Sequence, residues 1–359
     1  MKSKEISILM FDAAYPPPIL GGKEKQAHLL AKELSRQGVD CKALSYKHSG
    51  NSSEDHEGIL VDRVSPGIWA VPNLFLRLVA LRRKFKILHI HTPSRIGKIM
   101  VLLGFLLGYR IVFKFPNEHL LNSKHFIDRT VWTMLCWLVD LCVVLEEDTK
   151  NKLIDKGVNK KNIFFVANGV EMSQCKGISE SKKQIELIYV GRLVPQKACD
   201  QLIKACKILR KKNINFSLKI IGDGPLKNEM VHLVYDLNLG EQVYFVGYSN
   251  NPLAYMERSD ILVLPSLHEG MPNALLEAIS IGLPIVSTDV GAVRKQVGSF
   301  GEQFLCKPDD PECLAEKIYL LAGDPFLRKE YSKYLYKRGG EMFSIQAIAK
   351  QYIEKYKKL

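Results

Sequence analysis

Two acidic residues, Glu269 and Glu277, lie eight positions apart on either side of the turn GMPN at residues 270–273. Asn273 can begin the next helix, and a helix N-terminus leaves backbone N–H groups without intrahelical partners. Such groups attract anions, so residues 271–275 are a candidate anion site with one carboxylate on each side. Without any ligand, the same spacing could reflect a surface loop acid and a helix acid favoured by the macrodipole.

Two cations, Arg192 and Lys197, lie in the segment GRLVPQKACD, which follows the apolar run at residues 187–190. A planar guanidinium and a compact ammonium together suit a diphosphate. Glycine-containing loops also follow later apolar runs, and glycine lets the backbone approach a ligand closely. These glycines are Gly191, Gly222, Gly224, Gly247 and Gly270. The set predicts a ligand with a central diphosphate, a sugar on one side and a ribose on the other.

Short β-branched runs alternate with helical patterns and supply the elements that would position these residues. Alternation of this kind predicts βαβ units and mainly parallel sheets, in which ligands bind beyond the carboxyl ends of the strands. The predicted strands are residues 6–11, 41–45, 59–64, 87–91, 110–115, 141–145 and 163–166, then 187–190, 218–221, 243–246, 261–264 and 284–287.

A polar stretch without apolar periodicity, residues 171–184, separates the two runs of strands. We therefore predict an α/β fold with one unit at residues 1–170, a second at 185–340, and a cleft between them. A last helix, residues 344–359, can be capped by Ser344.

The composition, 47% hydrophobic and 25% charged over 359 residues, is typical of a soluble globular protein. The apolar run 6–11 is too short for a secretory signal, and the run 99–109 is shorter than the roughly 20 residues that span a bilayer. The eight cysteines are scattered without a C-x-x-C pair. We expect buried thiols in a reducing cytoplasm rather than metal ligands.

The net charge of +13 is concentrated in the first half, where residues 63–117 hold ten basic residues and no acidic one. Within this stretch, residues 73–86 (NLFLRLVALRRKFK) interleave apolar residues with cations, as in an amphipathic helix on anionic lipid. A core-facing helix with a basic outer side gives the same pattern, and nucleic-acid contact is a third interpretation. The candidate membrane-surface residues are Arg77, Arg82, Arg83, Lys84 and Lys86.

The segment EGMPNALLE closely resembles the E-x7-E signature of the retaining glycosyltransferases of family 4, which have the GT-B fold of two facing Rossmann-like domains. The resemblance covers nearly the whole chain. It includes PPPILGGKEKQAHLLAKEL, NGV at 168–170, GRLVPQKACDQLIKA, IIGDGPLKNEM, VGYSNNPLAYMERSDILVLPS and FSIQAIAKQYIEKY. It implies that the final helix crosses back onto the N-terminal domain.

The resemblance also implies residue roles. Arg192 and Lys197 would bind the donor diphosphate, Glu269 the transferred sugar and Glu277 the ribose, while Tyr248 would lie against the nucleobase. The remaining donor-binding candidates are backbone or turn residues: Gly22, Gly191, Gly222, Gly270, Met271, Pro272 and Asn273. No metal and no cofactor are expected, because cationic side chains and helix termini stabilise the leaving group.

The implied reaction is transfer of a glycosyl group from a nucleotide sugar, a UDP-sugar by family frequency, to an acceptor hydroxyl with retained configuration. Glu269 would stabilise charge and position the sugar rather than act as a nucleophile. A histidine that contacts the acceptor in many family members is replaced here by Lys114, Phe115 and Pro116. His119 and His91 are the candidate substitutes on the acceptor side.

We expect a lipid-linked glycan acceptor in surface polysaccharide or lipopolysaccharide synthesis, with the protein peripheral on the inner membrane face. The alternatives are a GT-B enzyme that glycosylates a small metabolite or polyglucan without lipid, and a non-catalytic basic nucleic-acid-binding protein. Aromatic residues are too sparse in the basic stretch to favour nucleic acid. A dinucleotide dehydrogenase is disfavoured because no G-x-G-x-x-G follows the first strand.

Overall fold

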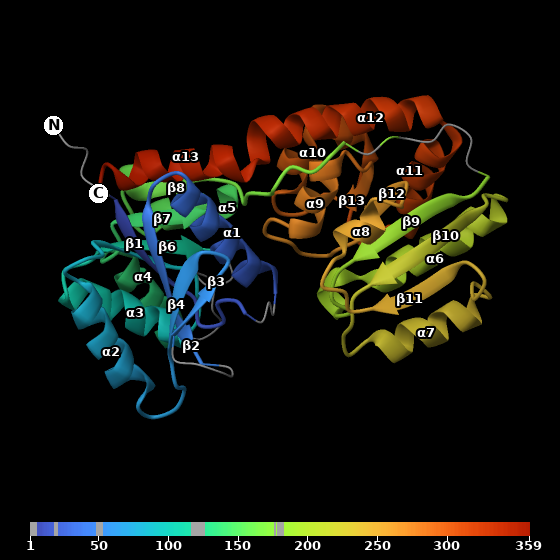
Figure 1. Ribbon diagram of the computed structural model, residues 1–359. Coiled ribbons are helices and arrows are strands. Elements are labelled where there is room, and N and C mark those ends of the chain that lie inside the picture. The colour runs from blue at the N-terminus through green and yellow to red at the C-terminus, as the bar shows by residue number, and fades with distance from the viewer. Residues whose placement is uncertain (1–5, 18–20, 48–52, 116–125, 176, 178–182) are drawn as a thin grey trace. The chain divides into compact units, whose positions relative to one another are not determined.

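The computed structural model describes residues 6–17, 21–47, 53–115, 126–175, 177 and 183–359. The chain forms two compact units (Figure 1). The N-terminal unit contains residues 1–169 together with 345–359, and the C-terminal unit contains residues 170–344.

The N-terminal unit is built on an eight-stranded sheet in the order β3-β4-β2-β1-β5-β6-β7-β8. β3 pairs antiparallel with β4, and the other neighbouring pairs run parallel. The strands are β1 (Ser7–Phe11), β2 (Asp40–Tyr46), β3 (Ser53–His56), β4 (Ile59–Val64), β5 (Ile87–Ile90), β6 (Arg110–Phe115), β7 (Leu141–Val144) and β8 (Ile163–Phe165).

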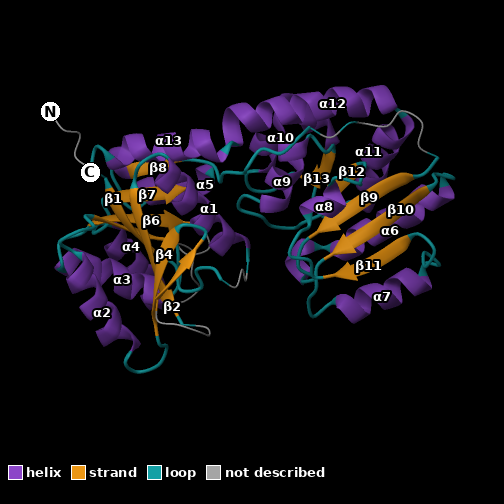
Figure 2. Ribbon diagram, in the orientation of Figure 1, coloured by secondary structure: helices purple, strands orange, loops and turns teal. Residues whose placement is uncertain are grey.

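Helices cover both faces of this sheet (Figure 2). They are α1 (Gly22–Arg36), α2 (Ala70–Leu81), α3 (Arg95–Leu106), α4 (Phe126–Cys136), α5 (Glu147–Asp155) and α13 (Ile345–Tyr356). Alternate side chains of β1 enter two different cores: Leu9 joins Leu74 of α2, whereas Ile8 joins Leu30 of α1. A strand buried on both faces is apolar throughout, which explains the continuous run SILMF.

The last helix, α13, packs in the same core as α1 although more than 300 residues separate them. Ile345 and Tyr352 are buried there, and Tyr356 Oη lies 2.8 Å from His89 Nδ1. Gln26 of α1 donates to the backbone oxygen of Gly169 at 2.8 Å. The predicted return of the final helix to the N-terminal unit is confirmed.

The C-terminal unit has a six-stranded sheet in the order β11-β10-β9-β12-β13-β14, with each neighbouring pair parallel. Its strands are β9 (Ile185–Val190), β10 (Phe216–Ile221), β11 (Val243–Gly247), β12 (Ile261–Leu264), β13 (Ile285–Thr288) and β14 (Leu305–Cys306). The chain adds β10 and then β11 on one side of β9. It then places β12, β13 and β14 in turn on the other side. The boundary between β9 and β12 is therefore the topological switch point, where ligands of such sheets bind.

The helices of this unit follow its strands. They are α6 (Cys199–Lys211), α7 (Lys227–Asp236), α8 (Leu253–Met256), α9 (Asn273–Ile281), α10 (Val293–Gly301), α11 (Pro311–Gly323) and α12 (Pro325–Arg338), with the short 3-10 helices η3 (Pro195–Lys197) and η4 (Glu302–Phe304). Among the described residues, no helix is both long and apolar enough to cross a membrane.

The twelve strands predicted from the sequence all occur, and the α/β prediction with parallel sheets in two units is confirmed. β3 and β14 were not predicted. β3 reads SEDH, a polar edge segment, and β14 has only two residues, so neither carries the apolar run by which a buried strand is recognised.

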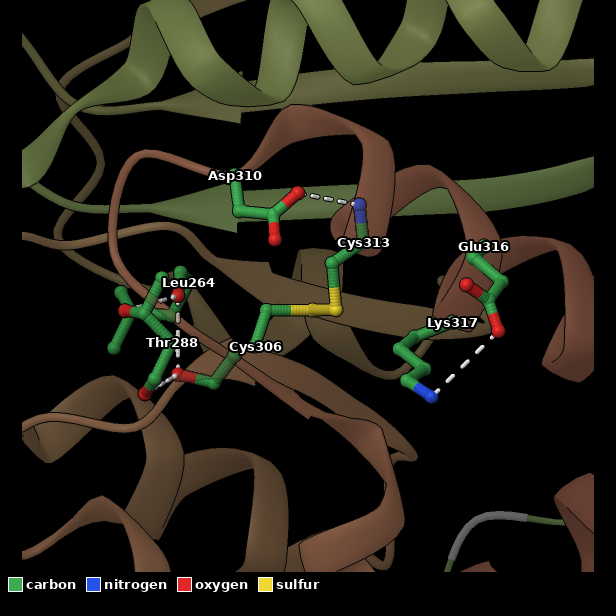
Figure 3. Close-up of a disulfide and its surroundings, with 8 residues drawn as sticks. Leu264, Thr288, Cys306, Asp310, Cys313, Glu316 and Lys317 are labelled. Atoms are coloured by element: carbon green, nitrogen blue, oxygen red, sulfur yellow. Dashed lines mark hydrogen bonds and ion pairs between the residues drawn. A yellow bond between two sulfur atoms is a disulfide. The ribbon is translucent and has the colours of Figure 1, made fainter.

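The expectation that all eight cysteines are thiols is wrong for Cys306 and Cys313, which form a disulfide (Figure 3). Cys306 ends β14 and Cys313 lies in the first turn of α11, with 5.8 Å between their Cα atoms. Asp310 caps α11 by accepting the Cys313 N–H at 2.8 Å, so a tight, capped turn brings the two sulfurs together. The spacing C-x6-C alone does not predict this turn.

Candidate active site

Two of the predicted site residues of the C-terminal unit, Lys197 and Glu269, meet at the switch point of its sheet. Lys197 follows β9, Glu269 follows β12, and the Lys197 Nζ lies 2.5 Å from Glu269 Oε1. The side chain of Lys197 is 19% exposed and that of Glu269 is 8% exposed. Ser266 Oγ also donates to Glu269 Oε1, at 2.8 Å. The carboxylate is thus held by one cation and one hydroxyl in a largely buried position.

The second cation, Arg192, is exposed at the start of the same loop. Its backbone is held in place, because the buried Tyr189 Oη donates to the Arg192 oxygen at 3.1 Å. The Leu193 N–H donates to the Asp223 oxygen at 2.9 Å. Arg192 therefore lies on a fixed turn in the same loop as Lys197.

Glycines pack the loops after β9 and β10 against each other. Gly222 has φ +139°, and a Cβ there would lie 1.9 Å from the Gly191 oxygen. A Cβ at Gly224 would lie 2.4 Å from the Leu193 oxygen. Glycine is required at these positions by backbone-to-backbone contact, whereas their predicted contact with a donor stays a prediction.

The loop that carries Glu269 is held by the segment between β13 and α10. Gly291 has φ +54°, and a Cβ there would lie 2.0 Å from the Glu269 oxygen. The neighbouring Ala292 N–H donates to the Gly270 oxygen at 2.8 Å. Gln296, which is fully buried, donates from Nε2 to the Pro272 oxygen at 3.1 Å. We call Gly291, Ala292 and Gln296 the support shell, because they hold the backbone of the loop that carries Glu269.

Helix α9 begins at Asn273, directly after this loop, with Pro272 as its extended N-cap residue. Met271 and Pro272 are buried, and the Ser280 Oγ donates to the Glu277 oxygen at 2.7 Å. Glu277 is half-buried in the second turn. The predicted geometry, a helix N-terminus between two acids, is therefore present, with Glu269 before the helix and Glu277 within it.

Tyr248 follows β11 at the same sheet edge and is 63% exposed. The Gly222 N–H donates to the Gly247 oxygen at 2.8 Å, which ties this loop to the one after β10. An exposed aromatic ring on a tethered turn is suited to stack on a planar base.

In the N-terminal unit, the switch point lies between β1 and β5. Asp12 follows β1 and is fully buried, and burial raises its pKa. Its Oδ1 accepts the Ala14 N–H at 2.9 Å, while Thr92 Oγ1 accepts the Ala13 N–H at 2.7 Å. Helix α1 begins nearby in the chain at Gly22, after an extended Gly21.

Two further polar groups are buried at the carboxyl ends of β6 and β8. Lys114 Nζ donates to Asn168 Oδ1 at 2.7 Å, and burial lowers the Lys114 pKa to about 8. Of the acceptor candidates, His91 is 1% exposed, with its ring centroid 4.1 Å from that of His89. Burial lowers the His91 pKa well below its ordinary value. His119 lies outside the described residues, so contact of either histidine with an acceptor stays a prediction.

Sequence reasoning missed the support shell. Gln296 lies in the polar run RKQVGSFG, where nothing in the sequence marks it as buried. Gly291 could have been noticed as a glycine that follows a strand in the segment TDVGAV, as in the loops after β9 and β10. Asn168 lies in the segment NGV, which is part of the family resemblance, but the sequence did not predict its hydrogen bond to Lys114.

Comparisons with known proteins agree with this architecture. A model of the Glycosyltransferase Family 4 domain matches residues 20–174, and a model of Glycosyl transferases group 1 matches residues 173–338. Together these two domains define a GT-B glycosyltransferase. The chain belongs to the family 4 type of these enzymes.

Individual relatives are also named as glycosyltransferases. An uncharacterized glycosyltransferase of Haemophilus influenzae is 27% identical over 87% of this chain and 90% of its own length. An N-acetylgalactosamine-N,N'-diacetylbacillosaminyl-diphospho-undecaprenol 4-alpha-N-acetylgalactosaminyltransferase of Campylobacter jejuni is 32% identical over 58% of each chain. Alignments with other curated relatives span 24% to 65% of those proteins' length.

Among solved structures, Anabaena HepE in complex with UDP has a TM-score of 0.81 at 17% identity, over 99% of this chain and 100% of that chain. At this identity the likeness shows the fold, which is GT-B.

Proposed function

We propose that this enzyme transfers a sugar from a nucleotide-sugar donor, with a UDP-sugar favoured, to an acceptor hydroxyl and retains the anomeric configuration. The observation that carries the proposal is the Lys197–Glu269 pair at the switch point, 2.5 Å between charged atoms, beside Arg192 and the N-terminus of α9. A cation, a carboxylate and a helix N-terminus in one place match a diphosphate bonded to a sugar.

In this mechanism the donor diphosphate takes the place of the carboxylate beside Lys197. Lys197 and Arg192 neutralise the charge that develops on the leaving phosphate as the glycosidic bond breaks. Glu269, released from its cation, accepts hydrogen bonds from hydroxyls of the transferred sugar. Glu277 binds the ribose hydroxyls, and Tyr248 stacks on the base.

Retention follows from attack on the same face that the phosphate leaves. The acceptor hydroxyl approaches beside the departing phosphate oxygen, which takes its proton. No protein nucleophile is needed, and the cations of the loop after β9 supply the stabilisation for which other transferases use a metal.

The test is a transfer assay with purified enzyme and several UDP-sugars, with the product linkage read by NMR. We expect nucleoside diphosphate release that depends on the acceptor, persists in EDTA, and gives the anomer of the donor. A product of inverted configuration, or transfer abolished by EDTA and restored only by a divalent cation, would overturn this mechanism.

For the acceptor we propose a lipid-linked glycan of surface polysaccharide synthesis, bound by the N-terminal unit. The Campylobacter relative carries diphospho-undecaprenol in its name, which supports this choice of acceptor class. The enzyme would then work at the inner face of the membrane, where such acceptors are presented.

The outer side of α2, α3 and α4 supports membrane docking. These helices lie side by side on one face of the N-terminal sheet, and their exposed apolar residues form what we call the apolar face. It comprises Ile68, Trp69, Phe75, Leu76, Val79, Leu102, Phe105, Leu106, Val131, Met134 and Trp137. Exposed apolar residues gathered on neighbouring helices indicate an interaction site, and the two tryptophans among them favour the lipid interface.

The cations around the apolar face have two different roles. Arg82 donates to the Leu107 oxygen at 3.0 Å and to the Gly108 oxygen, so it caps α3, and Lys84 pairs with Asp40 at 2.8 Å. Arg77, Arg83 and Lys86 are exposed. Lys86 also borders a groove of about 950 Å³ lined by Phe105 and Trp137 among others, a combination suited to lipid. Membrane attraction is therefore assigned to Arg77, Arg83 and Lys86.

Sedimentation with vesicles that contain phosphatidylglycerol tests this docking. Changing Arg77, Arg83 and Lys86 to Gln should weaken binding roughly 100-fold, since each cation near an anionic surface contributes about 1 kcal/mol. The control changes Lys211, Lys333 and Lys337 of the C-terminal unit, which are exposed cations, and should have no effect. Equal loss in both triple variants, or full transfer to a lipid-free acceptor, would favour a soluble acceptor instead.

A further inference from the structure

A cluster of two imidazoles and a carboxylate lies in the N-terminal unit, in residues to which the proposed transfer reaction gives no role. His28 comes from the second turn of α1, and His56 and Glu57 come from the hairpin between β3 and β4 (Figure 1). His28 Nε2 lies 3.6 Å from Glu57 Oε2, and the two imidazole centroids are 4.4 Å apart. One nitrogen from each ring and one carboxylate oxygen all lie within 4.8 Å of one another.

The ring nitrogens that face this cluster are unusual. His28 is 7% exposed, and among the described residues neither its Nε2 nor the Nε2 of His56 has a hydrogen-bond partner, although both atoms are buried. A buried nitrogen without a partner costs free energy, and a bound ion is one of the standard explanations for it. Two buried ring nitrogens without partners, on histidines that pack against each other beside a carboxylate, indicate a missing ligand.

We propose that His28, His56 and Glu57 bind a divalent transition-metal ion, with Zn²⁺ as the biological occupant. Imidazole nitrogen and carboxylate oxygen are common zinc ligands, and two histidines with one glutamate form a known zinc donor set. Water would complete the tetrahedron.

The surroundings of His28 match those of a metal-binding histidine. Its Nδ1 lies 3.2 Å from the Oη of Tyr15, a fully buried side chain. A histidine that binds metal through Nε2 carries its proton on Nδ1 and donates it to such a partner, which fixes the ring.

The other two ligands can adjust their positions. In a tetrahedral zinc site, ligand atoms lie about 3.4 Å apart, so the widest separations in the cluster must contract by up to about 1.4 Å. Glu57, at the hairpin turn, has a side chain that is 52% exposed, and His56 is half-buried. Lys32 Nζ lies 2.5 Å from Glu57 Oε2, and the metal would replace it as the partner of that oxygen.

Metal binding would tie the hairpin to α1 and to the loop after β1. Arg63 of β4 already donates to the Tyr15 oxygen at 3.0 Å and to the Pro17 oxygen at 2.9 Å. The ion would add a second link between the same elements. We therefore expect a structural role, without contact to the sugar or the phosphate.

The experiment uses the full-length protein freed of any affinity histidines. Zn²⁺ is titrated in competition with a chelating dye, and Co²⁺ is titrated with its visible absorption recorded. We expect one ion per chain, a Co²⁺ spectrum typical of tetrahedral N/O ligation, and a higher Tm with Zn²⁺. His56→Gln should lower the affinity at least 10-fold, and Tyr15→Phe, which preserves packing, should lower it about 10-fold to 100-fold.

The matched control is His232→Gln, which removes an exposed histidine of α7 and should change nothing. Because His56 is only half-buried, a cooperative melt of the metal-free His56→Gln variant shows that its fold is intact. Absence of stoichiometric Zn²⁺ binding in the wild type, or equal affinity in His56→Gln, would overturn the proposal. Stabilisation by a nucleoside diphosphate should be the same in His56→Gln, so failure here is distinct from failure of the donor site.

Discussion

Lys197 and Glu269 form an ion pair across the boundary between β9 and β12, 72 residues apart in the chain and 2.5 Å apart in space. The pair lies where the strand order of the C-terminal sheet reverses, which is where a ligand of such a sheet binds. A ligand that carries both a diphosphate and a sugar can satisfy the two partners separately. Under the proposed function, the ion pair would be the ligand-free form of a site that recognises both groups.

Lys197→Met removes the ammonium group and leaves the nearly buried carboxylate of Glu269 without its ion-pair partner. We expect kcat to fall about 10²-fold to 10³-fold, the typical cost of removing one group that stabilises developing negative charge. The measurement is steady-state transfer with saturating acceptor. Lys219→Met is the matched control, because Lys219 pairs with Glu186 at 3.5 Å in the same unit but away from the loops of the site. Comparable losses in the two variants would contradict a specific role for Lys197.

Gly291→Ala tests whether the Glu269 loop must be held in place. The new Cβ would lie 2.0 Å from the Glu269 oxygen and 2.6 Å from the Gly270 oxygen, so the loop must move. Since a displacement of about 1 Å can cost 10²-fold in rate, we expect a loss of that order together with a raised donor KM. Gly240→Ala, where a Cβ would meet nothing within 4 Å, should retain activity.

Gln296→Met should separate positioning from folding. It removes the donor to the Pro272 oxygen but keeps the volume of the buried side chain. The unpaired oxygen should cost about 1–3 kcal/mol of stability, and kcat should fall while the chain still melts cooperatively. Both quantities come from paired denaturant and transfer measurements. A stability loss of this size with wild-type kcat would show that Gln296 supports the fold alone.

Lys114 predicts a pH dependence of stability. Burial lowers its folded pKa from 10.5 to about 8, so between these values the unfolded chain binds more protons than the folded chain. Stability must then rise with pH across that range, by up to about 3 kcal/mol. Urea unfolding of wild type and Lys114→Met at pH 7.5 and pH 10 isolates this effect, because other groups cancel in the difference. A difference that is constant with pH would show that Lys114 titrates normally.

The redox state of Cys306 and Cys313 in the cell depends on the compartment in which the protein lies. The structure has this pair as a disulfide, and disulfides are rare in a reducing cytosol; if the enzyme works at the proposed inner membrane face, the bond should be reduced to two thiols in the cell. Alkylation of intact cells before lysis should label both residues, and labelling should decrease after air oxidation of the purified protein. A disulfide that is fully formed before lysis would contradict the proposed location at the inner face of the membrane.

Much of this architecture could be predicted because apolar runs and turn glycines are local signals. Strands such as β6 and β12 were predicted to the residue, since ILVL in β12 is an uninterrupted buried apolar run and β6 is buried and mostly apolar after Arg110. Arg192, Lys197 and Glu269 were predicted as site residues because charged residues in the loops after strands stand out, and Glu277 was predicted from its spacing to Glu269. The reversal of strand order then places two of them together.

The parts that could not be predicted depend on contacts between distant residues. Gln296 is polar and lies on a helix, so its burial under Pro272 is a property of the packed unit. The bond between Lys114 and Asn168, and the convergence of His28 with His56, likewise join residues that no sequence spacing relates. The cysteine pair was missed because its turn depends on the Asp310 cap.

The most direct measurement is the thermal stabilisation of wild type and Glu277→Ala by UDP, GDP, ADP and NAD. A ligand present at 100 times its Kd should stabilise the protein by about 2.7 kcal/mol. We predict that one nucleoside diphosphate, UDP in the first instance, stabilises the wild type and stabilises Glu277→Ala much less. A wild type that melts cooperatively but responds to none of the nucleotides, or a variant that responds equally, would contradict a donor site at the switch point of the C-terminal sheet.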